Sequence, residues 1–208
     1  HEVLVLVDGL DRPVLHALQY ARLLNPLSTT ALHVASGASV PEIRVAGTVS
    51  STGGGTGQSI ATAILVDSGA TVGKVTSSGT IRATVNGADG TAIAILDRTG
   101  GVALIENSGA ISASGAAGTS DRNVAVDLSA RASGATLRQT AVATGAAPSI
   151  KGEIRFGAGA DMLDVADGSV EGTSRFGGGA NTLKLGGDAT YSGTAIFGAG
   201  ADKVSINT

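Results

Sequence analysis

The sequence predicts an all-β fold, a parallel β-helix (solenoid) preceded by a short N-terminal segment with a βαβ-like pattern. One phrase occurs three times at nearly equal intervals, at residues 156–161 (FGAGAD), 176–181 (FGGGAN) and 197–202 (FGAGAD). A repeat of roughly 20 residues is typical of one solenoid turn, which buries its apolar face only by stacking on further copies. The composition agrees, with 32 Gly, 42% apolar and 2% aromatic residues. Aliphatic side chains suit a narrow interior, and Gly suits tight corners.

The N-terminal segment, residues 1–35, contains all three histidines and only one Gly. Residues 2–7 (EVLVLV) predict a buried strand. Asp11 is placed to cap a following helix, and Asn25-Pro26 to end it. Residues 30–34 (TALHV) predict a second strand, so the segment resembles a βαβ unit, which needs a parallel sheet. We expect it to be either a cap on the solenoid or a fused fragment.

Residues 36–208 form the predicted repeat domain, in which the repeat period is longer at first. Residues 78–81 (SGTI) correspond to residues 108–111 (SGAI), an interval longer than that between the Phe-Gly phrases. Each unit offers about three short strands separated by Gly- and Asn-containing turns, for example residues 80–85, 91–96 and 102–106. Three strands and three turns per period predict a three-faced coil. The sequence at 112–149 is less regular and indicates a looser coil or a protruding loop.

The C-terminal copies show the alternation of a half-buried strand. Leu163 and Val165 flank Asp164, and the same pattern recurs at residues 183–185 and 204–206. Side chains two positions apart point to the same side, so the apolar ones are predicted to face inward. The three Phe residues occupy equivalent places, and we expect their rings to stack in a row.

Charge and hydropathy exclude several classes of function. The net charge is −3 and no basic stripe occurs, so no nucleic-acid binding is expected. No apolar stretch approaches the roughly 20 residues that a membrane-spanning helix needs. The chain begins at His1 and has no signal-peptide pattern, so we expect a piece of a longer protein.

Two sets of polar residues are candidates for metal binding. The repeated phrase approaches the calcium-binding nonapeptide of secreted repeats, which makes Asp161, Asn181 and Asp202 the calcium candidates. The favoured alternative is that these residues only end turns. Asp67, Asp97 and Asp127 recur at equal intervals and are expected at exposed turns, because stacked carboxylates would repel one another.

No pattern for an enzyme stands out. A Ser-His-Asp triad needs a histidine, and none follows His33. The nucleophile elbow Gly-x-Ser-x-Gly is also missing. We therefore predict a non-enzymatic protein without catalytic residues and without a cofactor, calcium being the alternative.

The sequence of the repeats resembles the passenger regions of bacterial autotransporters. The likeness rests on residues 78–83 (SGTIRA), 91–97 (TAIAILD), 105–113 (IENSGAISA) and the three Phe-Gly phrases, and it covers about residues 39–208. It implies a β-helix exported through a C-terminal outer-membrane barrel of the parent protein. The location would be the cell surface, attached to the outer membrane, or the secreted fraction.

Residues 1–35 are similar to the start of the universal stress protein family, particularly to the related domain that ends some amino-acid permeases. The likeness rests on residues 5–9 (VLVDG), 17–22 (ALQYAR) and 31–34 (ALHV). It implies a nucleotide-binding segment with Asp8 near the adenine, and a cytoplasmic location if this segment defines the parent protein.

These observations leave three functions open. The first is an adhesin-like surface scaffold that contacts host or matrix molecules, and the second is a calcium-stabilised secreted repeat module. The third is a nucleotide-binding segment of the universal stress protein type.

Overall fold

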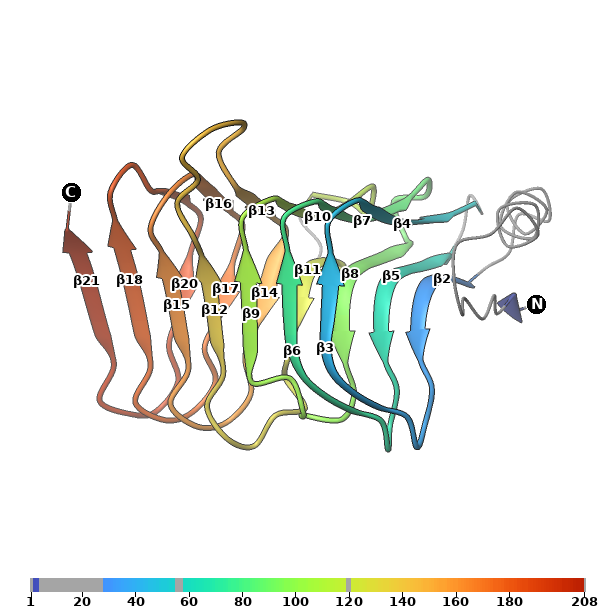
Figure 1. Cartoon of the computed structure of the whole chain (residues 1–208), viewed down its shortest axis with the longest axis horizontal. Helices are drawn as coiled ribbons and strands as arrows, with labels where there is room; N and C mark the ends of the chain where they lie inside the picture. The colour runs from blue at the N-terminus through green and yellow to red at the C-terminus, as the bar shows by residue number, and fades with distance from the viewer. Residues whose placement is uncertain (1, 4–27, 55–57, 119–120, 208) are drawn as a thin grey trace.

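The computed structural model describes residues 2–3, 28–54, 58–118 and 121–207, and every regular element in these ranges is a β-strand. The strands form three sheets, which we call A, B and C, and all strand pairs are parallel. The coils follow one another along a single axis towards the C-terminus (Figure 1). The predicted all-β fold of the parallel β-helix type is confirmed.

The three sheets differ in length. Sheet A consists of β1 (Glu2–Val3), β2 (Ser28–Val34), β5 (Ile60–Val66), β8 (Thr91–Asp97), β11 (Asn123–Asp127), β14 (Glu153–Arg155), β17 (Ser174–Arg175) and β20 (Ala195–Ile196). Sheet B consists of β3 (Ser39–Val45), β6 (Thr71–Ser77), β9 (Leu104–Asn107), β12 (Thr136–Gln139), β15 (Met162–Val165), β18 (Thr182–Gly186) and β21 (Lys203–Asn207). Sheet C consists of β4 (Thr48–Gly53), β7 (Thr80–Val85), β10 (Ala110–Ser114), β13 (Ser149–Lys151), β16 (Ser169–Glu171) and β19 (Thr190–Ser192).

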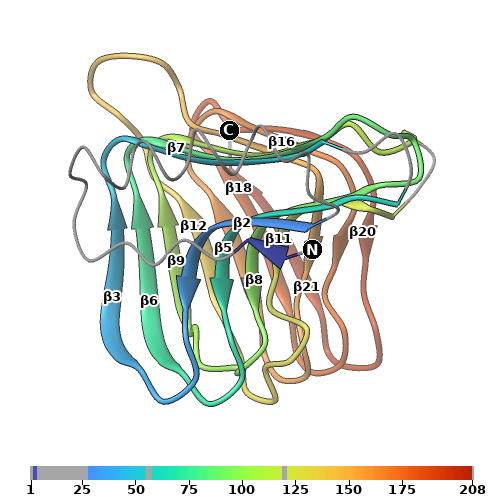
Figure 2. The same ribbon diagram turned by 90° about the vertical axis from the view of Figure 1, so that its right-hand side faces the viewer.

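From β2 on, the chain visits sheets A, B and C in turn, so each circuit places three strands on the three strands of the previous circuit. The view along the axis shows sheet C across the top and the first strands of sheet B, β3, β6 and β9, on the left (Figure 2). Circuits shorten along the chain, since Val75 pairs with Ile105 in an early circuit, whereas Leu163 pairs with the much nearer Leu183 in a late one. The strands of sheet A shorten with them, from seven residues in β5 to two in β17.

The core consists of aliphatic side chains that stack in register from coil to coil. In sheet C the row Ile81, Ile111 and Ile150 is fully buried. Leu163 and Val165 of sheet B are buried as the alternation predicts. Their equivalents in the last coil, Val204 and Ile206, are instead 54% and 64% exposed, because no described coil covers them.

The three phenylalanine rings stack as predicted. The ring centroids of Phe156 and Phe176 lie 5.2 Å apart, and those of Phe176 and Phe197 lie 4.6 Å apart, with interplanar angles of 14° and 11°. Phe176 is fully buried between its neighbours, while Phe197 is only partly buried. The register of the C-terminal coils therefore matches the repeat of the sequence.

The repeated glycines are explained by the close approach of successive turns. A Cβ added at Gly177 would lie 2.0 Å from the carbonyl oxygen of Gly157, and one at Gly179 would lie 2.0 Å from that of Gly159. Gly179 also has a φ of +101°, which L side chains rarely adopt. Between them, Gly178 meets nothing within 4 Å. The Gly-x-Gly phrase is thus a steric requirement of stacking.

The predicted strands agree closely with the observed ones. Strand 80–85 is β7, strand 91–96 is β8 extended to Asp97, and the strand expected at 102–106 is β9, which begins at Leu104. Within 112–149, β11 and β12 keep their places in sheets A and B. The irregularity lies in the connections, including residues 140–148, which protrude between β12 and β13 (Figure 1).

The N-terminal segment is described only in part. The predicted helix from Asp11 to Asn25 and the acid Asp8 lie outside the described residues. β1 and β2 pair in parallel, with Glu2 opposite Ser28, and β2 in turn pairs with β5. The strand predicted at residues 30–34 therefore belongs to sheet A, while the division of the chain at residue 35 stays a prediction.

Truncation of the stacked rings tests this register. We expect Phe176→Ala to lower the free energy of unfolding most, by about 3–5 kcal/mol, because Phe176 is packed on both sides. Phe156→Ala should cost less, and Phe197→Ala least. Denaturant unfolding midpoints measure the order, and small, equal losses at all three positions would contradict the stacked arrangement.

Adjacent glycines provide a matched pair for the steric requirement. Gly179→Ala should lower the free energy of unfolding by more than about 2 kcal/mol, because the new Cβ meets a carbonyl oxygen in a disfavoured backbone conformation. Gly178→Ala should change it by less than about 1 kcal/mol, because the added methyl enters open space. Equal effects in thermal or denaturant unfolding would show that the turns do not approach as described.

Candidate functional site

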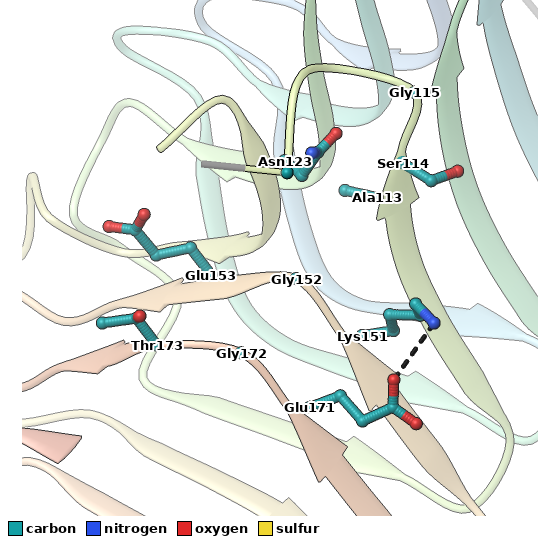
Figure 3. Close-up of a pocket in the computed structure, with 11 residues that line it drawn as sticks. Ala113, Ser114, Gly115, Asn123, Lys151, Gly152, Glu153, Glu171, Gly172 and Thr173 are labelled. Carbon is teal, nitrogen blue, oxygen red and sulfur yellow. Dashed lines mark ion pairs between the residues drawn. The ribbon is translucent and has the colours of Figure 1, made fainter. Parts of the chain in front are cut away.

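A groove of about 330 Å³ lies at the corner where sheet C turns into sheet A. Its wall is formed by three successive coils, with lining residues Ala113, Ser114, Gly115, Gly118, Asn123, Lys151, Gly152, Glu153, Glu171, Gly172 and Thr173 (Figure 3). Positive φ values at Gly115, Gly152 and Gly172 turn the chain at this corner. A Cβ at any of the three would meet a backbone oxygen of a neighbouring segment, so glycine is needed here for the close stacking of the turns.

The charged side chains of the groove are paired with one another or with neighbours. Lys151 and Glu171 are direct partners on β13 and β16, and Lys151 Nζ lies 3.1 Å from Glu171 Oε2. Buried Glu153 accepts hydrogen bonds at Oε1 from Arg155 Nε at 3.0 Å and from Arg175 Nε at 2.6 Å. The Lys151–Glu171 and Glu153–Arg175 contacts join neighbouring coils.

Asn123 also serves the local fold. Its Oδ1 accepts a hydrogen bond from the backbone N–H of Ala116, and its Nδ2 donates to the carbonyl oxygen of Ala116, both at 3.0 Å. The side chain thereby fixes the connection between β10 and β11 next to the groove. Among the described residues that line the groove, Ser114 and Thr173 carry the hydroxyl groups.

The three repeated acids at the ends of sheet A strands cap turns, but none of them is exposed, so the predicted exposure is wrong. Asp97 and Asp127 are buried, and Asp67 is half-buried. Asp97 Oδ1 accepts from the backbone N–H and the hydroxyl of Thr99, and its Oδ2 accepts from the N–H of Val102. Carboxylates that satisfy backbone donors can be buried, a compensation that spacing alone does not reveal.

Asp67 lies near the described histidine. Its Oδ2 is 3.1 Å from His33 Nε2, and its Oδ1 accepts from the backbone N–H of Ser68 at 2.8 Å. The hydrogen bond from Ser68 is the main reason why the pKa of Asp67 is lowered, and the contact with His33 acts in the same direction. The pair joins β2 to the turn after β5, and no described serine completes a triad with it.

The calcium candidates Asp161, Asn181 and Asp202 are brought together, one above the other, by the stacking of coils. The backbone N–H of Asp161 donates to Asn181 Oδ1 at 3.0 Å, and that of Asn181 donates to Asp202 Oδ1 at 2.9 Å. The N–H of Ala135 donates to Asp161 Oδ1 at 2.7 Å in the same way. We call this series of bonds the Asx chain. In the Asx chain, the side chain of each Asp or Asn accepts a hydrogen bond from a backbone N–H of the preceding coil.

Asp161 is the member of the Asx chain with an unsatisfied buried oxygen. It is 1% exposed, and its Oδ2 has no hydrogen-bond partner. In the next coil the corresponding atom is Asn181 Nδ2, which donates to the Gly179 carbonyl oxygen and to Asp202 Oδ1. Burial raises the pKa of Asp161 to about 6, although the N–H of Ala135 and the charge of Arg131 act in the opposite direction.

The outer face of sheet B carries a row of alternating charges that sequence reasoning missed. We call its members the charge ladder: Glu42, Lys74, Glu106, Arg138, Asp164 and Lys184. Lys74 Nζ lies 3.6 Å from Glu42 and 2.7 Å from Glu106, and the hydrogen bond with Glu106 is the main cause of its raised pKa. Arg138 bridges Glu106 and Asp164 at 3.8 and 3.4 Å. The members do not all share one register row, because Lys74 lies opposite Leu104 and Glu106 lies opposite Thr76, so the Lys74–Glu106 pair is diagonal and repeat spacing alone does not reveal it.

In the described ranges, no three His, Cys, Asp or Glu side chains are grouped so that they could hold a metal ion. The same ranges contain no helix that is long and apolar enough to cross a membrane. Comparison of the chain with protein-family models, curated proteins and solved structures gives no significant match.

Replacement of Asp161 by Asn tests the cost of its unpaired oxygen. The native carboxyl keeps its proton up to about pH 6, whereas an unfolded Asp loses it near pH 3.9, so this group makes the wild type less stable as pH rises through that range. We expect Asp161→Asn to remove this component and to raise the free energy of unfolding at pH 7 by up to roughly 3 kcal/mol.

The reverse substitution, Asn181→Asp, is the matched control. It places a second carboxylate beside Asp202 Oδ1 and the Gly179 carbonyl oxygen, and it should destabilise the fold at pH 7. Denaturant unfolding between pH 4 and pH 7 measures both variants. A difference between wild type and Asp161→Asn that does not change with pH would contradict the assignment.

Proposed function

We propose that this chain is a non-enzymatic scaffold, an adhesin-like fragment of a bacterial autotransporter passenger that is displayed at the cell surface or secreted. The single observation that carries the proposal is the use of charged side chains to join coils, as in the charge ladder from Glu42 to Lys184. Networks of such pairs restrain neighbouring coils relative to one another and thereby contribute to the rigidity of the solenoid. The resemblance in repeat text supplies the autotransporter part of the proposal.

The outer face of sheet C is the face best suited to contact host or matrix molecules. One row along it consists of small side chains in register, namely Thr48, Thr80, Ala110, Ser149, Ser169 and Thr190. Short side chains lose little conformational entropy on binding, and hydroxyl groups both donate and accept hydrogen bonds. Exposed Arg82 stands in the adjacent row, beside Ser50 and Ser112. Sheet B is less suitable because its charges already neutralise one another.

A binding assay with immobilised laminin, fibronectin and heparan sulfate tests the scaffold proposal. We expect the folded chain to bind at least one of these molecules and to lose binding after thermal unfolding. Arg82→Glu should weaken binding at least about fivefold, because its charge lies on the contact face. The control Arg44→Glu changes an arginine that is also exposed to solvent, on sheet B, and it should have little effect.

Two results would oppose the scaffold proposal. One is the failure of the folded chain to bind any of the three molecules, and the other is equal weakening by Arg82→Glu and Arg44→Glu. Turnover of a glycan, ester or peptide by the purified chain would oppose its non-enzymatic character.

The calcium-stabilised module is a second candidate because of one observation, the buried and unpaired Oδ2 of Asp161. A cation beside this oxygen would offset its charge, but calcium takes 6–8 oxygen ligands. The Asx chain supplies only one side chain per coil, and those of Asn181 and Asp202 are engaged in hydrogen bonds. The scaffold without a metal is therefore the preferred proposal.

Thermal unfolding with and without millimolar calcium separates these two candidates. We expect no change in the melting temperature, since a ligand that binds only the native state must stabilise it. An upward shift that Asp161→Ala abolishes would favour the calcium module instead.

A further inference from the structure

The last coil, formed by β19, β20 and β21, continues the inward rows of sheet B but leaves these rows uncovered on one side. Val204 pairs with Leu183, and Ile206 pairs with Leu185. Leu163, two coils earlier in the row of Val204, is fully buried, whereas Val204 is mostly exposed. Side chains of this kind stabilise the protein only when another layer covers them.

The ring of Phe197 is also covered on one side only. It stacks on Phe176 at 4.6 Å, and Phe176 has a second ring, Phe156, on its other face at 5.2 Å. Phe197 has no second ring among the described residues, and it is only partly buried. A further aromatic side chain at the same place would complete the stack in the way already realised at Phe176.

At the same end of the solenoid, the last member of the Asx chain has no described side chain that accepts its backbone N–H. The N–H groups of Ala135, Asp161 and Asn181 each donate to an Asx side chain of the following coil. Asp202 is the last member in the described part of the chain, and no following side chain there accepts its N–H. The backbone N–H of Asp202 lies next to the exposed apolar residues Val204 and Ile206. An occupant of this surface therefore has to supply both a hydrogen-bond acceptor and apolar side chains.

We propose that the β19–β20–β21 face is a docking surface for a glycine-rich segment that has the chemistry of this chain's own short coils. The three copies define what the segment needs: an aromatic residue, an Asx residue five positions later, and apolar residues seven and nine positions later. Phe156, Asp161, Leu163 and Val165 show these spacings, and the copies that begin at Phe176 and Phe197 repeat them. The segment adds strands in parallel, each paired with β19, β20 or β21.

A second copy of this chain is a poorer occupant of the same surface. Two copies that meet through their C-terminal coils would run in opposite directions, so the Phe and Asx rows could not continue in register. The described coil at the other end is also unsuitable, because β2, β3 and β4 contain no Phe, Tyr or Trp. The proposal concerns a binding surface and holds whatever the scaffold contacts through sheet C.

A fluorescent peptide with the sequence of residues 176–196 is a direct probe of this surface. We expect it to bind the full-length chain with a dissociation constant below about 1 mM, measured by fluorescence anisotropy. Binding should slow hydrogen exchange at the amides of β21. Val204→Lys and Ile206→Lys should each weaken binding at least about tenfold, while circular dichroism shows that the fold is kept.

The controls test register and place. A peptide in which the residues equivalent to Phe176 and Asn181 are Ala should bind at least about tenfold more weakly. Ile60→Lys changes another exposed apolar residue, on β5, and should leave binding unchanged. Three results would overturn the proposal: no binding at about 1 mM peptide, binding that Val204→Lys and Ile206→Lys do not affect, or self-association in sedimentation that these substitutions abolish.

Discussion

Parallel, in-register stacking of coils is the constraint on which the rest of this structure depends. Strands in a sheet lie about 4.8 Å apart, so each side chain has its equivalent in the next coil as its nearest neighbour. A residue that packs well against a copy of itself can be repeated, which explains the isoleucine row of sheet C and the three phenylalanines. The Gly-x-Gly corners follow from the same constraint, because successive backbones there come too close for a Cβ at either glycine.

The same constraint makes repeated charges costly, and the chain resolves this in two ways. On sheet B the sign alternates along the charge ladder, so each carboxylate lies beside cationic groups, as Glu106 does between Lys74 and Arg138. In the Asx chain an amide stands between two acids, and Asn181 donates a hydrogen bond to Asp202. Departures from perfect repetition are thus a consequence of stacking and do not indicate loss of the repeat.

The sequence was sufficient to predict the fold class, most strands and the stacked rings, because these depend on local alternation and on period. It was insufficient where the burial of a polar side chain depends on the groups that satisfy it. Asp97 is buried because Thr99 and Val102 satisfy its oxygens, and Asp164 is mostly buried between Arg138 and Lys184 of the neighbouring coils. The groove at the corner of sheets C and A was not foreseen either, since it is formed by the offset of three coils around glycine turns.

The distribution of polar groups also limits where this molecule can act. Inside the solenoid, polar side chains such as Asn107 and Gln139 are used to hold turns, with Gln139 Nε2 donating to the carbonyl oxygen of Asp167 at 2.7 Å. On sheet B the charges satisfy one another. The hydroxyl-rich face of sheet C and the uncovered last coil are therefore the surfaces that we propose for contacts with other molecules. The first offers polar contacts along the rod, and the second offers strand edges and apolar side chains at its end. The two proposed contacts thus lie on different parts of the solenoid, one along its length and one at its C-terminal end.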